Sequence, residues 1–149
     1  MAVLSPMYPR GPVDVSNRLH ELPENEVPFM SGWRWIHTPG HSPGHISLWR
    51  ESDRSMIVGD AFITTNQESA YAVVVQKPEL HGPPKFYTPD WPSSKESVEE
   101  LASLEPELVV TGHGQAMKGA EMRDSLHLLA QEFDQIAVPE HGRYVTTAE

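Results

Sequence analysis

Residues 37–45 read HTPGHSPGH and lie between two short segments of alternating bulky and polar residues, 33–36 (WRWI) and 46–49 (ISLW). Alternation with a period of two is typical of strands that bury one face. The two Pro-Gly steps exclude a continuous helix or strand, because proline lacks a backbone donor and glycine favours turns. The sequence therefore predicts two strands joined by a tight turn that carries His41 and His45.

Two further segments have the same layout, in which an apolar strand ends and a metal-competent side chain follows. Residues 55–60 (SMIVGD) deliver Asp60, and residues 107–114 (ELVVTGHG) deliver His113. Strand ends hold a side chain firmly, and neighbouring glycines let an ion or a substrate approach closely. Imidazole and carboxylate ligands together suit zinc, iron or manganese. A single histidine after a strand is more often structural and a single Gly-Asp is usually a turn, so the metal interpretation depends on all three segments occurring together.

The strings HTPGHSPGH, VGDAF and TGHG resemble the last three metal motifs of the metallo-β-lactamase superfamily, most of all its glyoxalase II-like branch, and they occur in the family's order. The resemblance implies that His41 binds one metal, that Asp60 bridges two metals and that His113 binds the second. It also implies metal-dependent hydrolysis through a metal-bound hydroxide, with zinc as the expected ion and iron or manganese as alternatives. Because the sequence has no cysteine, esters, thioesters or lactones are favoured over antibiotics, since the best-known β-lactamase subclass uses cysteine at the position of Asp60.

The resemblance further implies an α/β (α+β) fold class. The family fold is a four-layer αββα sandwich of two similar halves, and this chain resembles the C-terminal half, a mixed β-sheet with helices on one face. The defining His-x-His-x-Asp-His motif of the other half is missing, and the only histidine before His37 is His20. Each metal would lose two protein ligands, so we expect a divalent ion to be bound weakly or not at all. The isolated chain is therefore expected to be weakly active or inactive.

The remaining histidines have other expected roles. His45 is expected to hold the loop or the tautomer of a ligand rather than to bind metal, since Pro43 and Gly44 prevent a helical pairing with His41. His37 is expected to be structural, and His81, in a proline-rich loop, is a candidate residue of a substrate cleft. The other three are expected at the surface: His20, His127 and His141.

Length and composition limit the remaining possibilities. A chain of 149 residues fits one domain, with a loop-rich lead-in at 1–31, the metal-motif region at 32–114 and a C-terminal helix and tail at 115–149. No apolar run is long enough to cross a membrane, and no signal peptide is visible, so a cytoplasmic location is expected. The net charge of -10 disfavours nucleic acid as a partner.

The expected helices cover only one face of the sheet. Ser93 and Glu96 form a capping-box pattern for a helix over 93–105, and a second helix over 122–136 carries an apolar stripe (Met122, Leu126, Leu129, Phe133 and Ile136). A further strand is predicted at 71–76. The other sheet face would expose Trp33 or Trp35, Ile46, Leu48 and residues 73–75, a patch larger than soluble monomers tolerate. We expect a homodimer or a separate N-terminal half-domain to cover it, and the alternative function is a non-catalytic homodimeric metal-binding or protein-interaction module.

Overall fold

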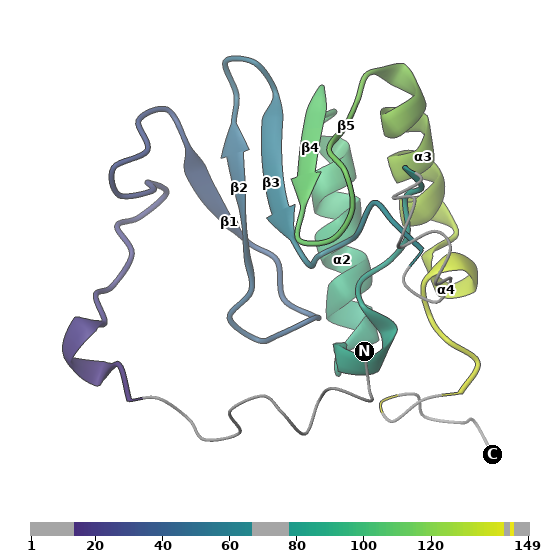
Figure 1. Ribbon diagram of the computed structural model, residues 1–149, viewed down its shortest axis with the longest axis horizontal. Coiled ribbons are helices and arrows are strands. Elements are labelled where there is room, and N and C mark those ends of the chain that lie inside the picture. The colour runs from purple at the N-terminus through teal and green to yellow at the C-terminus, as the bar shows by residue number, and fades with distance from the viewer. Residues whose placement is uncertain (1–13, 67–77, 142–143, 145–149) are drawn as a thin grey trace.

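The computed structural model describes residues 14–66, 78–141 and 144. Its centre is a five-stranded sheet with the order β1-β2-β3-β4-β5, formed by β1 (Arg34–His37), β2 (Ile46–Arg50), β3 (Ser55–Gly59), β4 (Leu108–Thr111) and β5 (Met117–Lys118) (Figure 1). The pairs are antiparallel except for β3 with β4, which are parallel. A mixed sheet with helices, the α/β architecture expected from the sequence, is therefore confirmed.

The strand directions bring the three motifs to one edge of the sheet. Because β1 and β3 are both antiparallel to β2, they run in the same direction, and β4 runs parallel to β3. The carboxyl ends of β1, β3 and β4 therefore lie at the same edge. Each of these ends leads into one of the candidate ligands His41, Asp60 and His113.

The helices pack on one face of this sheet. α2 (Trp91–Ser103) connects β3 to β4, while α3 (Ala120–Gln131) and the short α4 (Phe133–Ile136) follow β5 (Figure 1). Two 3-10 turns complete the described elements, η2 (Ser16–Arg18) and η3 (Lys85–Tyr87). The core lies between this sheet face and the helices, where the largest fully buried side chains include Phe62, Phe133, Met56, Leu101, Met122, Leu126 and Leu129.

The first helix begins earlier than the capping-box pattern predicted. The N-cap is Asp90, whose side chain accepts from the backbone N–H of Ser93, and Pro92 lies in the first turn, where its missing N–H costs nothing. The helix ends at Ser103, before the expected boundary, and Glu105 takes a positive φ of 52°. The prediction of a helix over 93–105 was therefore wrong at both ends.

The second predicted helix is two helices. The chain leaves helical geometry at Glu132, with φ -110° and ψ 27°, between α3 and α4. The apolar stripe survives this break, because Met122, Leu126, Leu129 and Phe133 are all buried. The strand predicted at 71–76 lies outside the described residues.

The sheet face away from the helices carries a row of apolar side chains. Register pairs Trp35 with Leu48, Leu48 with Ile57, and Ile57 with Val110. The first three are partly exposed, and Val110 is 39% exposed. We call these four residues the open row. Among the described residues, no helix has the length and apolar composition that crossing a membrane requires.

Candidate metal centre

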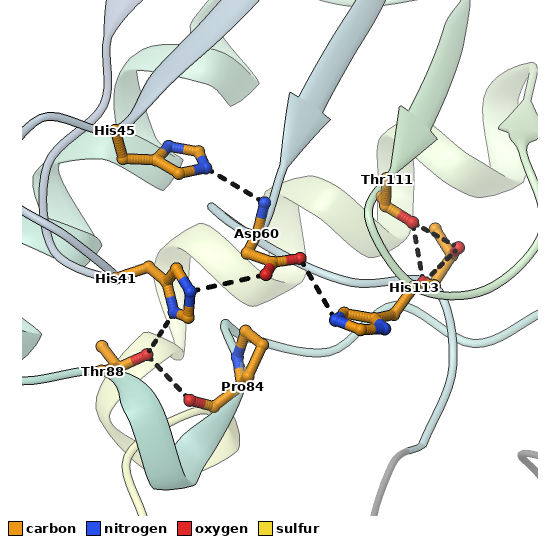
Figure 2. A network of polar contacts seen from close by, with 8 residues as sticks. His41, His45, Asp60, Pro84, Thr88, Thr111 and His113 are labelled. Carbon is orange, nitrogen blue, oxygen red and sulfur yellow. Dashed lines mark hydrogen bonds and ion pairs between the residues drawn. The ribbon is translucent and has the colours of Figure 1, made fainter. Parts of the chain in front are cut away.

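The three predicted ligands lie together at the carboxyl edge of the sheet, with Asp60 between the two histidines (Figure 2). His41 Nε2 is 3.4 Å from Asp60 Oδ2, and His113 Nε2 is 3.6 Å from Asp60 Oδ1. Each imidazole therefore faces a different oxygen of one carboxylate. The His113 side chain is 43% exposed and the His41 side chain 19%, so the site is open to solvent on the His113 side.

The backbone of Asp60 is held by His45, as Figure 2 shows. The Asp60 N–H donates to His45 Nε2 at 3.1 Å, so this ring nitrogen carries no proton. The other ring nitrogen, Nδ1, is 3.1 Å from the Thr38 carbonyl oxygen, an obligatory acceptor, and must carry the ring proton. Burial lowers the pKa of His45, and the neighbouring His41 lowers it further, which favours this neutral form. His45 thus contacts the backbone of Asp60 rather than its carboxylate.

Gly59 and Gly112 leave room for the contact between His45 and Asp60 and for the Asp60 carboxylate. Gly59 has φ +53°, and a Cβ there would stand 2.8 Å from His45 Nε2. A Cβ at Gly112 would stand 2.3 Å from Asp60 Oδ1, far inside van der Waals contact. The Asp60 carboxylate therefore occupies space that only glycine leaves at position 112.

Asp60 Oδ1 is buried without a hydrogen-bond partner. A buried carboxylate oxygen without a partner is unfavourable unless a cation or a hydrogen-bond donor faces it. Here it faces the imidazole of His113, a side chain that can bind a metal ion. This unpartnered oxygen, the space at Gly112 and the donor set of two imidazoles and one carboxylate all fit a divalent ion.

The described donors do not converge on a single point. Within the residues that the structure describes, no three His, Asp or Glu side chains form a group that could hold one metal ion as they stand. Two ligands bound to zinc at tetrahedral angles stand about 3.4 Å apart, close to the two separations seen here, 3.4 and 3.6 Å. Each imidazole and the carboxylate oxygen that it faces therefore have the spacing of two ligands of one ion.

Two threonine hydroxyls fix the loop that carries His113. Thr111 Oγ1 donates to the His113 carbonyl oxygen at 2.8 Å, and Thr64 Oγ1 donates to the Gln115 carbonyl oxygen at 2.6 Å. Thr64 N–H also donates to the His113 carbonyl oxygen at 3.0 Å. Sequence reasoning missed both threonines, because Thr64 lies 47 residues from Thr111 and no local pattern links the two.

The loop that carries His41 is held in a similar way. His37 Nε2 is 2.8 Å from the Pro43 carbonyl oxygen, which agrees with a structural role for this exposed ring. His41 Nδ1 lies 3.4 Å from the hydroxyl of Thr88, which is fully buried. Sequence reasoning also missed Thr88.

The other histidines have different surroundings. His81 forms an isolated backbone bridge with Ile63, and its Nε2 lies 3.5 Å from Glu79 Oε2. Among the described contacts, none joins His81 to the three candidate ligands, so its place in a substrate cleft stays a prediction. His20 and His141 are exposed, and half-buried His127 pairs with Glu105.

Comparison with known proteins identifies a family. The family model of the metallo-beta-lactamase superfamily matches residues 2–113. The probable metallo-hydrolase YflN of Bacillus subtilis is 49% identical over 137 residues, which cover 91% of this chain and 52% of that protein. The chain therefore spans about half the length of this curated relative.

Two solved structures share the fold. A metallo-beta-lactamase superfamily protein from the archaeon Sulfolobus tokodaii matches with a TM-score of 0.58 at 19% identity, over 99% of this chain and 51% of that chain. A beta-lactamase domain protein from Burkholderia ambifaria matches with a TM-score of 0.53 at 22% identity, over 77% of this chain and 33% of that chain. At these identities the likeness establishes the fold alone.

Proposed function

The chain belongs to the metallo-beta-lactamase superfamily, and from this premise we propose that it supplies part of the metal site of a hydrolase for esters, thioesters or lactones. Membership of this superfamily implies binding of a divalent metal. The observation that carries the proposal is the Asp60 carboxylate, which offers one oxygen to each of two imidazoles. His41 and Asp60 would hold one ion, and Asp60 and His113 the other, with zinc as the expected metal.

The protein's own groups have distinct tasks in this proposal. A bound divalent ion supplies a Lewis acid for a carbonyl and lowers the pKa of a water molecule. His41 and His113 present ring nitrogens from loops after β1 and β4 that hydrogen bonds hold in place, so binding an ion requires little further ordering of these side chains. His45 fixes the backbone of Asp60, and Gly112 leaves room for its carboxylate. The exposed side at His113 is the side from which a substrate would approach.

Esters, thioesters and lactones are favoured over antibiotics as substrates because the residue at position 60 is an aspartate. The best-known β-lactamase subclass uses a cysteine at this position, and this sequence contains no cysteine. Imidazole ligands suit zinc and iron and carboxylate ligands suit manganese, so the ligand set is compatible with zinc as the expected metal and with iron or manganese as alternatives.

The isolated chain is proposed to be a poor catalyst. Three protein ligands shared between two ions leave each ion open and weakly held. The sequence contains no His-x-His-x-Asp-His string that would complete the set. We therefore expect turnover of simple esters, thioesters and lactones far below the roughly ten per second of ordinary enzymes, even with added zinc.

Metal titration tests the proposal. Calorimetry with Zn²⁺, Mn²⁺ and Fe²⁺ should show binding that Asp60→Asn weakens by at least about tenfold, since even residues behind metal ligands contribute that much. The matched control is Asp53→Asn, which changes an exposed aspartate in the β2–β3 turn. Equal affinity of the wild-type chain and Asp60→Asn would refute the assignment of Asp60.

A second candidate function is a non-catalytic interaction module, which the open row favours. A sheet face with apolar side chains on four strands is suited to binding another protein layer. Substrate turnover that appears when a separate half carrying a His-x-His-x-Asp-His motif is added to the chain, and that His113→Ala abolishes, would support the hydrolase over this alternative.

A further inference from the structure

We infer that Thr88 is a positioning residue, whose buried hydroxyl holds His41 in the tautomer that leaves Nε2 free to bind a metal ion. The inference rests on the proposed function for its purpose, but the tautomer itself is a property of the metal-free chain. Nothing in the sequence motifs marks Thr88, which lies 47 residues beyond His41.

The Thr88 hydroxyl has a single proton, and this determines the direction of its hydrogen bonds to Pro84 and His41. Thr88 Oγ1 donates to the Pro84 carbonyl oxygen at 2.9 Å, and a carbonyl can only accept. A hydroxyl has one proton, so toward His41 Nδ1, 3.4 Å away, Thr88 can only accept. The contact is long for a hydrogen bond, and its direction follows from the use of the Thr88 proton on Pro84. His41 Nδ1 must therefore carry the proton, and Figure 2 shows this chain of contacts from Pro84 through Thr88 to His41.

A proton on His41 Nδ1 determines the state of the other ring nitrogen, Nε2. In the neutral ring, a proton on Nδ1 leaves Nε2 as a lone pair, and Nε2 faces Asp60 Oδ2 at 3.4 Å. Two acceptors that face each other are unfavourable unless a cation lies between them. A ring that carried both protons would instead donate to Thr88 and to Asp60, and this charged form is the state that competes with the neutral one.

The loop before His41 is held by the start of α2, independently of the contact between Thr88 and His41. Thr88 lies between η3 and Asp90, the N-cap of α2. Asp90 N–H donates to the Gly40 carbonyl oxygen at 3.3 Å, and Ser97 Oγ donates to the Pro39 carbonyl oxygen at 2.7 Å.

The loop before His41 lies so close to α2 that no side chain fits between them at Gly40. A Cβ at Gly40 would stand 2.5 Å from the Cα of Ser94, so only glycine permits the contact. The start of α2 therefore fixes the position of the loop before His41. The Thr88 hydroxyl then contacts the imidazole ring that this loop carries.

Three variants separate this role from a structural one. Thr88→Val removes the hydroxyl at nearly constant shape, Thr88→Ser restores it, and Ser97→Ala removes a hydroxyl that holds the same loop without touching the ring. Long-range proton–nitrogen correlation spectra of the metal-free protein, recorded above the ordinary pKa of histidine, report the tautomer of His41 directly.

We expect the Nδ1–H form in the wild-type chain, in Thr88→Ser and in Ser97→Ala, and a mixture of both tautomers in Thr88→Val. Zinc affinity measured by calorimetry should fall about tenfold in Thr88→Val and stay near wild type in the other two. An Nε2–H or doubly protonated His41 in the wild-type chain overturns the inference, and this result needs no variant to fold. An unchanged tautomer in folded Thr88→Val overturns it as well. Absence of any zinc binding by wild type would count against the proposed function instead, and the tautomer would still decide the role of Thr88.

Discussion

At the scale of single residues, the candidate site depends as much on small residues as on ligands. Gly112 allows the Asp60 carboxylate to lie under the β4 end, and Gly59 allows His45 to reach the Asp60 backbone. Sequence reasoning assigned the glycines beside the motifs a general role in close approach. The structure shows which atom each of them admits.

Substitution of Gly112 should disturb the site without unfolding the chain. In Gly112→Ala the new Cβ would stand 2.3 Å from Asp60 Oδ1, so the carboxylate must move. We expect zinc affinity to fall by at least about tenfold, comparable with the loss of a group that supports a ligand. Calorimetric titration measures the affinity, and circular dichroism checks the fold.

The matched control for this variant is Gly44→Ala. Gly44 also lies in a histidine-bearing turn, but nothing lies within 4 Å of a Cβ built there. Its zinc affinity should equal that of the wild-type chain. If both variants bind zinc equally well, the space at Gly112 does not determine the position of the Asp60 carboxylate.

The local sequence was sufficient to predict the three candidate ligands but not their supports. Asp60 directly follows β3, and His41 and His113 lie in the loops just after β1 and β4, so strands that run in the same direction bring all three to one edge. Thr64 and Thr88 contact the site from loops: Thr88 lies 47 residues from His41, and Thr64 lies 51 residues from Gln115, whose carbonyl oxygen it binds. Contacts at such separations depend on the tertiary fold, which no local pattern encodes.

At the scale of elements, α2 links the fold to the site. Ser97 of α2 binds the loop before His41, and the buried side chains of this helix, among them Val98 and Leu101, fill the core against the sheet. Periodicity predicted the buried face correctly. The start was misplaced because Ser93 and Glu96 fit a capping box, whereas the preceding Asp90 takes the extended backbone that an N-cap requires.

Replacement of Asp90 should show which residue caps the helix. Asp90 Oδ1 accepts from the Ser93 N–H at 3.1 Å, and Asp90 Oδ2 accepts from the Ser93 hydroxyl at 2.8 Å. Loss of an N-cap carboxylate costs about 1 kcal/mol, so Asp90→Ala should lower the free energy of unfolding by that amount in urea titrations. Glu96→Ala should be nearly neutral, because Glu96 is not the cap partner. A larger loss in Glu96→Ala than in Asp90→Ala would restore the capping-box prediction.

At the scale of the whole molecule, the sheet is covered unequally. The helices bury one face, while the open row of Trp35, Leu48, Ile57 and Val110 crosses four strands on the other. The sequence predicted a bare face from the number of amphipathic helices, and in the described part of the chain no helix packs on it. Burial of roughly 400 Å² of such surface would contribute on the order of 10 kcal/mol, a strong driving force for association.

We propose that a second copy of the chain covers the open row. Two copies related by a two-fold axis would place row against row, as aligned sheets pack in sandwiches. The row is apolar along its length, so the same surface can face itself without bringing like charges together. A separate half-domain of the same fold is the alternative occupant, and it would compete for the same face.

Light scattering decides between a dimer and a monomer. The wild-type chain should have twice the 16.7 kDa mass of one copy at micromolar concentration. Leu48→Asp places a charge in the middle of the row, so it should yield monomers that bind hydrophobic dyes, or insoluble protein. The matched control is Leu128→Asp, because Leu128 is 48% exposed on α3 and lies outside the row. This control should remain dimeric. A stable wild-type monomer that binds no dye would contradict the proposal, because it would mean that the row is already covered within one chain.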